Sequence, residues 1–185
     1  MATTTSIVGT TSAAHFDGFL SDDGTVSRIR DGQGPICSNF SSLSIPAGAT
    51  IDGIEVLLEG TAIDVNHDTA VGDWIHVSND GGSSWSTAQS ITTGPWIAYG
   101  GVDTLELAGG TSELWGESWN ATTAAAIQVK MEWSTSDGDA VFLDYVSVRI
   151  TYTGGVVVST TYPSDDNVIL KNGLAELKNG LTIIK

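Results

Sequence analysis

The sequence predicts an all-β fold: an antiparallel β-sandwich of jelly-roll type, followed by a short C-terminal β-meander. Only 16% of the 185 residues are charged, against about 25% in an ordinary soluble domain. The polar character comes instead from Ser, Thr, Asn and 22 Gly, a composition typical of turn-rich β proteins. Several segments alternate apolar and polar residues as half-buried strands do, and no segment longer than about ten residues keeps a helical period free of Gly.

Composition divides the chain into three parts. Residues 1–15 are rich in Thr and Ser and predict an N-terminal arm that orders on binding. Residues 16–153 carry the strand patterns and predict the sandwich domain. Residues 154–185 predict an attachment or oligomerisation extension. With 41% hydrophobic residues and six Trp, the chain can bury a core without disulfides.

The first clear strand pattern covers residues 51–60. Ile54, Val56 and Leu58 fall on one face and predict core positions, whereas Glu55 and Glu59 fall on the other and predict solvated carboxylates. A second short strand is expected over Asp73–Val77. The turn sequence at residues 79–82 then predicts a hairpin toward Trp85.

Residues 78–85 match the pattern S-x-D-x-G-x-x-W, which resembles the Asp-box hairpin of sialidase-type propellers. There the Asp caps the turn and the Trp packs beneath it. The box occurs once here, whereas a propeller needs one per blade. It therefore indicates a structural hairpin.

Two further strands and one helical turn complete the predicted sandwich. Residues 126–133 alternate between an apolar face (Ile127, Val129, Met131, Trp133) and a polar face (Gln128, Lys130, Glu132). A long strand is expected over residues 141–152, with Phe142, Val146, Val148 and Ile150 on the face that points into the core. The one helical candidate is a short turn over residues 120–125.

The C-terminal segment contains the repeat Leu-Lys-Asn-Gly-Leu, at residues 170–174 and again at 177–181. Asn-Gly pairs are strong hairpin-turn signals, so residues 168–184 predict three very short strands, with a coiled-coil heptad as the weaker alternative. Strands this small are not stable alone. They either form an edge hairpin of the sandwich or dock on another chain. The apolar positions expected to mediate attachment or oligomerisation are Val168, Leu170, Leu174, Leu177, Leu181 and Ile183.

Charge and targeting signals narrow the function classes. A net charge of −15 with no basic patch argues against nucleic-acid binding. The single cysteine, Cys37, cannot form an intrachain disulfide and is expected to be buried. The N-terminus has no signal-peptide pattern, and no apolar run of about 18 residues occurs, so we expect neither secretion nor membrane insertion.

No motif predicts catalysis or a metal centre. His15, His67 and His76 have no metal-ligand spacing, and neither a nucleophile elbow nor a phosphate-binding loop is present. We therefore expect no enzyme, no catalytic residue and no cofactor. Glu132, like Glu55 and Glu59, alternates with apolar residues and is expected to be solvated.

Asp144 is the exception among the acidic residues, because it shares a predicted strand face with Phe142 and Val146. A buried carboxylate needs hydrogen-bond donors or a cation, and Arg28, Arg30 or Ca²⁺ can serve. Structural calcium stays open as an alternative, since Asp-Gly-rich loops offer hard oxygen ligands at Asp22, Asp23, Asp137 and Asp139.

Three tryptophans are the candidate ligand-binding residues. Trp96, Trp115 and Trp119 lie in irregular sequence, and exposed indole faces can stack on sugar rings. The alternative is that these rings close the ends of the sandwich.

Three segments resemble a β-sandwich module of tailed-phage virion proteins. They are residues 43–56 (LSIPAGATIDGIEV), the WGxxW element at 115–119 and the closing strand at 143–153, in that order, with the Asp80-Gly81-Gly82 hairpin between them. The resemblance covers about residues 16–153. It implies a head decoration protein, a head fibre or a tail-associated adhesin, and it supplies no catalytic motif.

Three hypotheses follow from the residues and the resemblance. The first is a non-enzymatic capsid decoration or head-fibre subunit, assembled in the host cytoplasm into the virion. It would be a homotrimer attached to the major capsid protein or other virion proteins. The second is a carbohydrate-binding tail-fibre adhesin that recognises a host surface glycan. A glycan-active enzyme is the third and has the least support, because no acid/base pair is evident.

Overall fold

The computed structural model describes residues 1–7, 10–11, 24–30, 33–40, 43–62, 74–91, 104–132, 140–156, 168–171 and 174–177. The first half of the chain supplies β1 (Ala2–Ile7), β2 (Thr10–Thr11), β3 (Ser27–Arg30), β4 (Ile36–Ser38), β5 (Ala47–Ala62) and β6 (Trp74–Ser78). The rest of the chain supplies β7 (Gln89–Ser90), β8 (Thr104–Gly110), α1 (Ala121–Ala125), β9 (Gln128–Glu132), β10 (Ala140–Val156), β11 (Val168–Lys171) and β12 (Leu174–Leu177).

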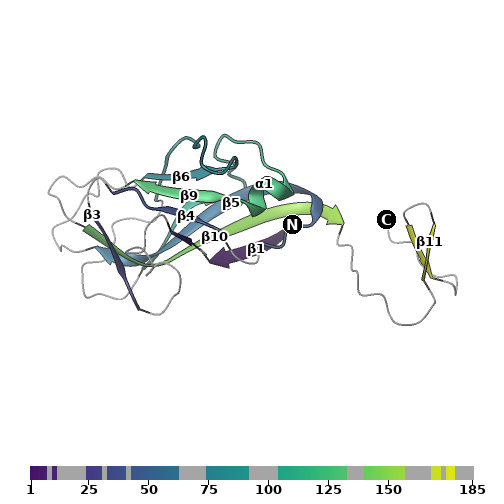
Figure 1. Cartoon of the computed structure of the whole chain (residues 1–185), viewed down its shortest axis with the longest axis horizontal. Coiled ribbons are helices and arrows are strands. Elements are labelled where there is room, and N and C mark those ends of the chain that lie inside the picture. Colours follow the sequence, from purple (N-terminus) through teal and green to yellow (C-terminus); the bar gives the residue numbers. More distant parts are fainter. Residues whose placement is uncertain are drawn as a thin grey trace.

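Two antiparallel sheets pack face to face (Figure 1). Sheet A has the order β1-β10-β5-β8, with β3 also paired to β10, and sheet B has the order β2-β4-β9-β6-β7. The eight strands from β3 to β10 therefore form the facing sets β3-β10-β5-β8 and β4-β9-β6-β7. This is the connectivity of a jelly roll, and it confirms the predicted fold class.

The core lies between the two sheets. Ile54, Val56 and Leu58 of β5 are fully buried, as the alternation predicts. On β9 the side chains of Val129 and Met131 are buried too. The helical turn expected near residue 120 is α1, which begins after the N-cap Asn120.

A β-bulge changes the predicted face of β10. The register with β5 shifts between Leu143 and Tyr145, so Asp144 is an extra residue in the strand. Leu143 is therefore in the core, fully buried, whereas Phe142 is only half-buried and the expectation for Phe142 was wrong. Beyond the bulge the predicted core positions Val146, Val148 and Ile150 are fully buried.

The two ends of the predicted sandwich also differ from expectation. Residues 2–7, expected in an arm, form β1 and pair with residues 147–152 of β10. At the other end, β10 continues past residue 153 to Val156, which pairs with Ala47. Both extensions add main-chain pairing at the same end of sheet A, where Figure 1 shows the N-terminus beside the end of β10.

The C-terminal segment forms a separate two-stranded sheet. β11 and β12 pair in antiparallel register, with Val168 opposite Leu177 and Lys171 opposite Leu174. The two residues between them are Asn172 and Gly173, so the predicted Asn-Gly hairpin is present. The third strand expected after residue 180 lies outside the described residues. Figure 1 shows the hairpin beyond the end of β10.

Candidate functional site

The Asp80 loop joins β6 to β7 and is organised around one carboxylate. Asp80 Oδ1 accepts hydrogen bonds from the Ser83 and Ser84 main-chain N–H groups, each 3.0 Å, and from Ser78 Oγ at 2.8 Å. Ser84 Oγ donates to Oδ2 at 2.6 Å. These bonds, first those from Ser84, lower the pKa of Asp80 to about 2. The predicted Asp-box hairpin is confirmed, and Asp80 acts as its turn cap.

Trp85 follows this loop and packs over the outer face of sheet B. Lys130 Nζ lies 5.1 Å from the centre of the Trp85 ring and 2.7 Å from Glu132 Oε1. The hydrogen bond from Lys130 lowers the pKa of Glu132. Beside them, the His76 ring nitrogen Nδ1 is 2.9 Å from Ser86 O, so that nitrogen donates to the main chain. One face of the Trp85 ring is therefore covered by a cation.

The second loop, residues 111–120, contains the predicted tryptophan pair. Trp115 has a left-handed backbone with φ 60°, which is costly for a bulky residue. Its main-chain N–H donates to Glu113 Oε1 at 2.6 Å, and its indole Nε1 donates to Ile54 O at 3.0 Å. A Cβ on Gly109 would lie 2.9 Å from the Trp115 ring, so glycine is required for this close packing.

Trp115 consequently belongs to the core. It is 1% exposed and contacts the buried cluster between the sheets. Its ring has no free face for a sugar, so its assignment to a glycan platform was wrong. The alternative reading, in which the ring packs into the sandwich, holds for Trp115; the loop has no periodic pattern that would decide between the two from the sequence.

Trp119 is partly buried against the same core, and its Nε1 donates to Leu114 O at 2.9 Å. Directly after it, Asn120 caps α1 by accepting from the Thr122 and Thr123 main-chain N–H groups. The indole donor of Trp119 is thus already used, although part of its surface is open. Trp96, the third predicted platform residue, lies outside the described residues, and so does Trp133.

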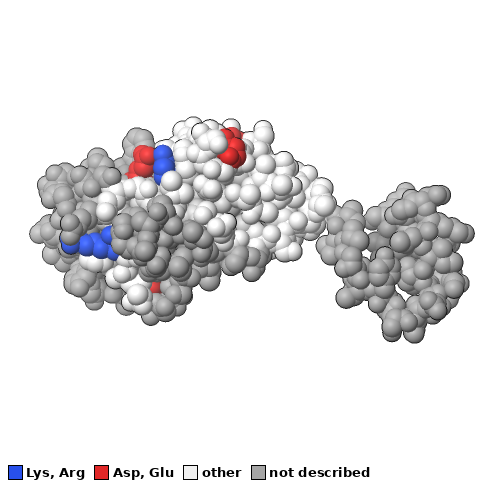
Figure 2. Space-filling model, viewed as in Figure 1, with Lys and Arg blue, Asp and Glu red and all other residues white. Residues whose placement is uncertain are grey.

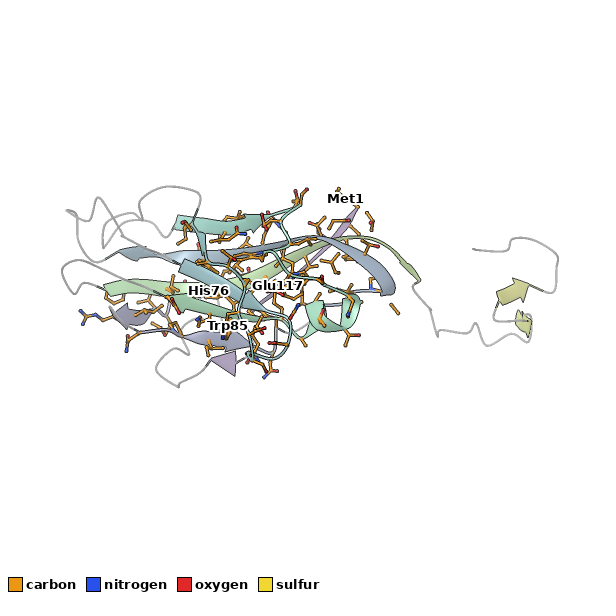
Figure 3. The ribbon with its side chains drawn as sticks, turned by 90° about the horizontal axis from the view of Figure 1, so that it is seen from above. Met1, His76, Trp85 and Glu117 are labelled. Atoms are coloured by element: carbon orange, nitrogen blue, oxygen red, sulfur yellow. The ribbon has the colours of Figure 1, made fainter. Side chains whose placement is uncertain are left out.

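The two loops contact each other. Asn79 Nδ2 donates to Ser118 O at 3.0 Å and to Glu117 Oε2 at 3.3 Å. Figure 3 shows His76, Trp85 and Glu117 in the same region of the molecule, contributed by β6 and by these two loops. The structure therefore brings the Asp80 hairpin and the WGxxW element together, which their separation in sequence does not predict.

Sequence analysis also missed an ion pair on the outer face of sheet A. Arg149 donates from Nε to Glu55 Oε2 and from Nη2 to Glu55 Oε1, both at 2.6 Å. The expectation that Glu55 is solvated was wrong, because its side chain is 6% exposed. The bonds to Glu55 raise the pKa of Arg149. Glu132, with a side chain 50% exposed, is solvated as predicted.

Among the described residues on the face shown in Figure 2, few side chains are charged, and in one place Lys or Arg lies directly beside Asp or Glu. In the described part of the chain, no three His, Cys, Asp or Glu residues are grouped so as to hold a metal ion. His15, His67 and the four loop aspartates considered as calcium ligands fall outside the described residues.

Cys37 is fully buried, as predicted, and burial raises the pKa of its thiol.

The predicted attachment residues divide by register. Val168 is opposite Leu177 and Leu170 is opposite Ala175, so these positions share one face of the hairpin. Leu174, opposite Lys171, takes the alternate register position. Leu181 and Ile183 lie outside the described residues.

Comparisons with protein-family models, with curated proteins and with solved structures find no match to this chain. No helix among the described residues has the length and apolar character needed to cross a membrane.

Proposed function

We propose that this chain is a non-enzymatic structural protein of a tailed-phage virion. In this role it is a capsid decoration or head-fibre subunit, associates as a homotrimer and attaches to the major capsid shell through its C-terminal segment. The observation that carries the proposal is the β11–β12 hairpin, since among the described strands these two pair with each other and with none of the sandwich strands. An isolated two-stranded hairpin is at best marginally stable in water, so it needs a docking surface.

Pairing register supports an attachment role for the hairpin. The positions of Val168, Leu170, Ala175 and Leu177 give it one entirely apolar face. Burying such a face against a partner contributes about 25 cal/mol per Å² of apolar surface. The same face on neighbouring copies can supply that surface in a trimer.

Charge distribution along the chain supports the same role. The last eighteen residues contain three of the seven cationic side chains, Lys171, Lys178 and Lys185, and one of the 22 acidic ones, Glu176. This segment carries a charge of +2 and the remainder carries −17. The basic segment is therefore attracted to acidic surfaces, whereas the body repels them.

The carbohydrate-binding alternative has less support. Of its three candidate residues, Trp115 fills the core and Trp119 is partly buried with its indole N–H bonded. Part of the Trp119 surface stays exposed, and Trp96 stays a candidate on its sequence alone. A glycan screen of the wild type and of Trp96→Ala and Trp119→Ala tests this alternative.

The experiment that tests the virion role is co-sedimentation with capsid shells. The chain is co-expressed with the major capsid protein of the same genome, and shells are isolated on a gradient. We expect the full chain to sediment with the shells and a chain ending at Val158, which keeps all of β10, to stay unbound. Leu177→Asp should bind at least tenfold more weakly, whereas Glu176→Gln, at the adjacent register position, should bind normally. A full chain that stays unbound, or a truncated chain that binds equally, would contradict the proposal.

A further inference from the structure

His76 of β6 has an incomplete set of hydrogen-bond partners. Its side chain is 13% exposed. The ring nitrogen Nδ1 lies 2.9 Å from the main-chain oxygen of Ser86, and a carbonyl oxygen can only accept, so Nδ1 carries a proton and donates it. The other nitrogen, Nε2, is buried and has no hydrogen-bond partner among the described residues. A buried polar atom without a partner is uncommon and costly, so the surroundings of Nε2 matter.

Glu132 of β9 is the group that Nε2 faces. Glu132 Oε2 lies 3.6 Å from Nε2, whereas the other carboxylate oxygen, Oε1, is bonded to Lys130 Nζ at 2.7 Å. Each oxygen of this carboxylate therefore has its own neighbour. Without a proton on Nε2, two hydrogen-bond acceptors face each other. With a proton there, an N–H donor faces a negatively charged oxygen.

The charges on the elements around His76 decide whether a proton is favoured there. Lys130 is directly opposite His76 in the register of β6 and β9, but its ammonium group is bonded to Glu132. The carboxylate of Asp80 is bonded within its own loop. On the other side of β6, β7 contributes only neutral residues. Burial of the ring opposes a positive charge, whereas the free oxygen of Glu132 favours it.

We propose that His76 is a pH-dependent latch that fastens the Asp80 loop to β9. When Nε2 takes a proton from solvent, the ring donates from Nδ1 to Ser86 O and from Nε2 to Glu132 Oε2. One imidazolium then joins the loop that carries Trp85 and Ser86 to the neighbouring strand. Histidine suits this role, since its ordinary pKa of about 6.5 places the change near neutral pH.

The latch acts in a defined direction with pH. A proton that is bound more tightly in the folded than in the unfolded protein stabilises the fold below the ordinary histidine pKa of about 6.5, and this stabilisation is lost as the pH rises above that value. Asp80 acts in the opposite direction, because its pKa falls from 3.8 to about 2 in the folded protein. The Asp80 loop should therefore be held most firmly between about pH 4 and pH 6.

The test uses the full chain, which has three histidines. Nitrogen-15 NMR of the His76 ring should show a proton on Nδ1 alone at pH 8.0 and on both nitrogens at pH 5.5. The equilibrium constant for unfolding, measured in urea, should be roughly two- to fivefold larger at pH 8.0 than at pH 5.5, as expected for a partly exposed ion pair. This difference should be lost in His76→Gln. It should persist in His67→Gln, which removes a histidine from another part of the sequence.

Glu132→Gln tests the partner of the latch. It removes the carboxylate at a side chain that is 50% exposed, and it carries the test alone if His76→Gln does not fold. At pH 6.5 we expect the protonated fraction of His76 to fall at least twofold in this variant. The proposal is overturned if His76 carries a single proton at pH 5.5, or if the wild type is equally stable at both pH values. It is also overturned if the pH difference persists in folded His76→Gln, or if Glu132→Gln leaves the protonated fraction unchanged.

Discussion

Glu55 and Arg149 face each other directly across β5 and β10 and form a two-bonded ion pair on the outer face of sheet A. The Glu55 side chain is 6% exposed and that of Arg149 is 35% exposed. The buried Glu55 carboxylate therefore depends on the Arg149 guanidinium to balance its negative charge. The pair connects the two longest strands of the sandwich, and its removal tests how sheet A is held together.

We predict that Arg149→Met destabilises the protein by about 2–4 kcal/mol, because it leaves the Glu55 carboxylate buried without its partner. The double variant Glu55→Leu/Arg149→Met should recover most of this loss, since it removes the stranded charge. Urea unfolding of the four proteins of this double-mutant cycle measures the effect. Additive losses in the double variant would contradict the account.

The Asp80 loop should be sensitive to acid. The pKa of Asp80 falls from 3.8 to about 2 in the folded protein, so its stabilising contribution is present above the ordinary pKa and is lost as the pH falls from about 4 to 2. Asp80→Asn should reduce this part of the acid sensitivity. Urea unfolding between pH 5 and pH 2 measures this effect. If the free energy of unfolding falls with pH equally steeply in the wild type and in Asp80→Asn, the prediction is refuted.

Trp115 and Trp119 should respond differently to substitution. We predict that Trp115→Ala costs about 3–5 kcal/mol, because it empties a core position and removes the bond to Ile54. Trp119→Ala, at a partly exposed position, should cost about half as much or less. Chemical denaturation measures both. Equal, small losses would mean that Trp115 is not a core residue.

Cys37 should be unreactive in the folded state. It is fully buried, and burial raises its thiol pKa, so little reactive thiolate forms near neutral pH. At pH 8 we expect a thiol reagent to label Cys37 at the rate of global or local opening, and to label it fully in denaturant. Rapid labelling of the native protein, at the rate of a free cysteine, would contradict the burial of β4.

Local alternation predicts much of this fold. It predicts the core faces of β5 and β9 and the core face of β10 beyond the bulge. The turn residues at Asp80 and Asn172 predict two hairpins. The errors share a non-local cause. The bulge at Asp144 moves Leu143 into the core in place of Phe142, and its position depends on how β10 pairs with β5.

The candidate functional site and the buried ion pair are harder to predict from the sequence than the strands are. Burial of Glu55 follows from its register with Arg149, which lies 94 residues away in the chain. Burial of Trp115 follows from a left-handed turn and from the space at Gly109. Neither the register nor the turn leaves a local pattern that could have been found beforehand.

The most direct test of the central proposal is the solution mass of the full chain, measured by light scattering after size exclusion at micromolar concentration. We predict about 58 kDa, three times the 19.2 kDa chain, and a monomer for both Leu177→Asp and the chain ending at Val158. Glu176→Gln should remain a trimer. A monomeric full chain, or a truncated chain that still forms trimers, would contradict assembly through the C-terminal hairpin.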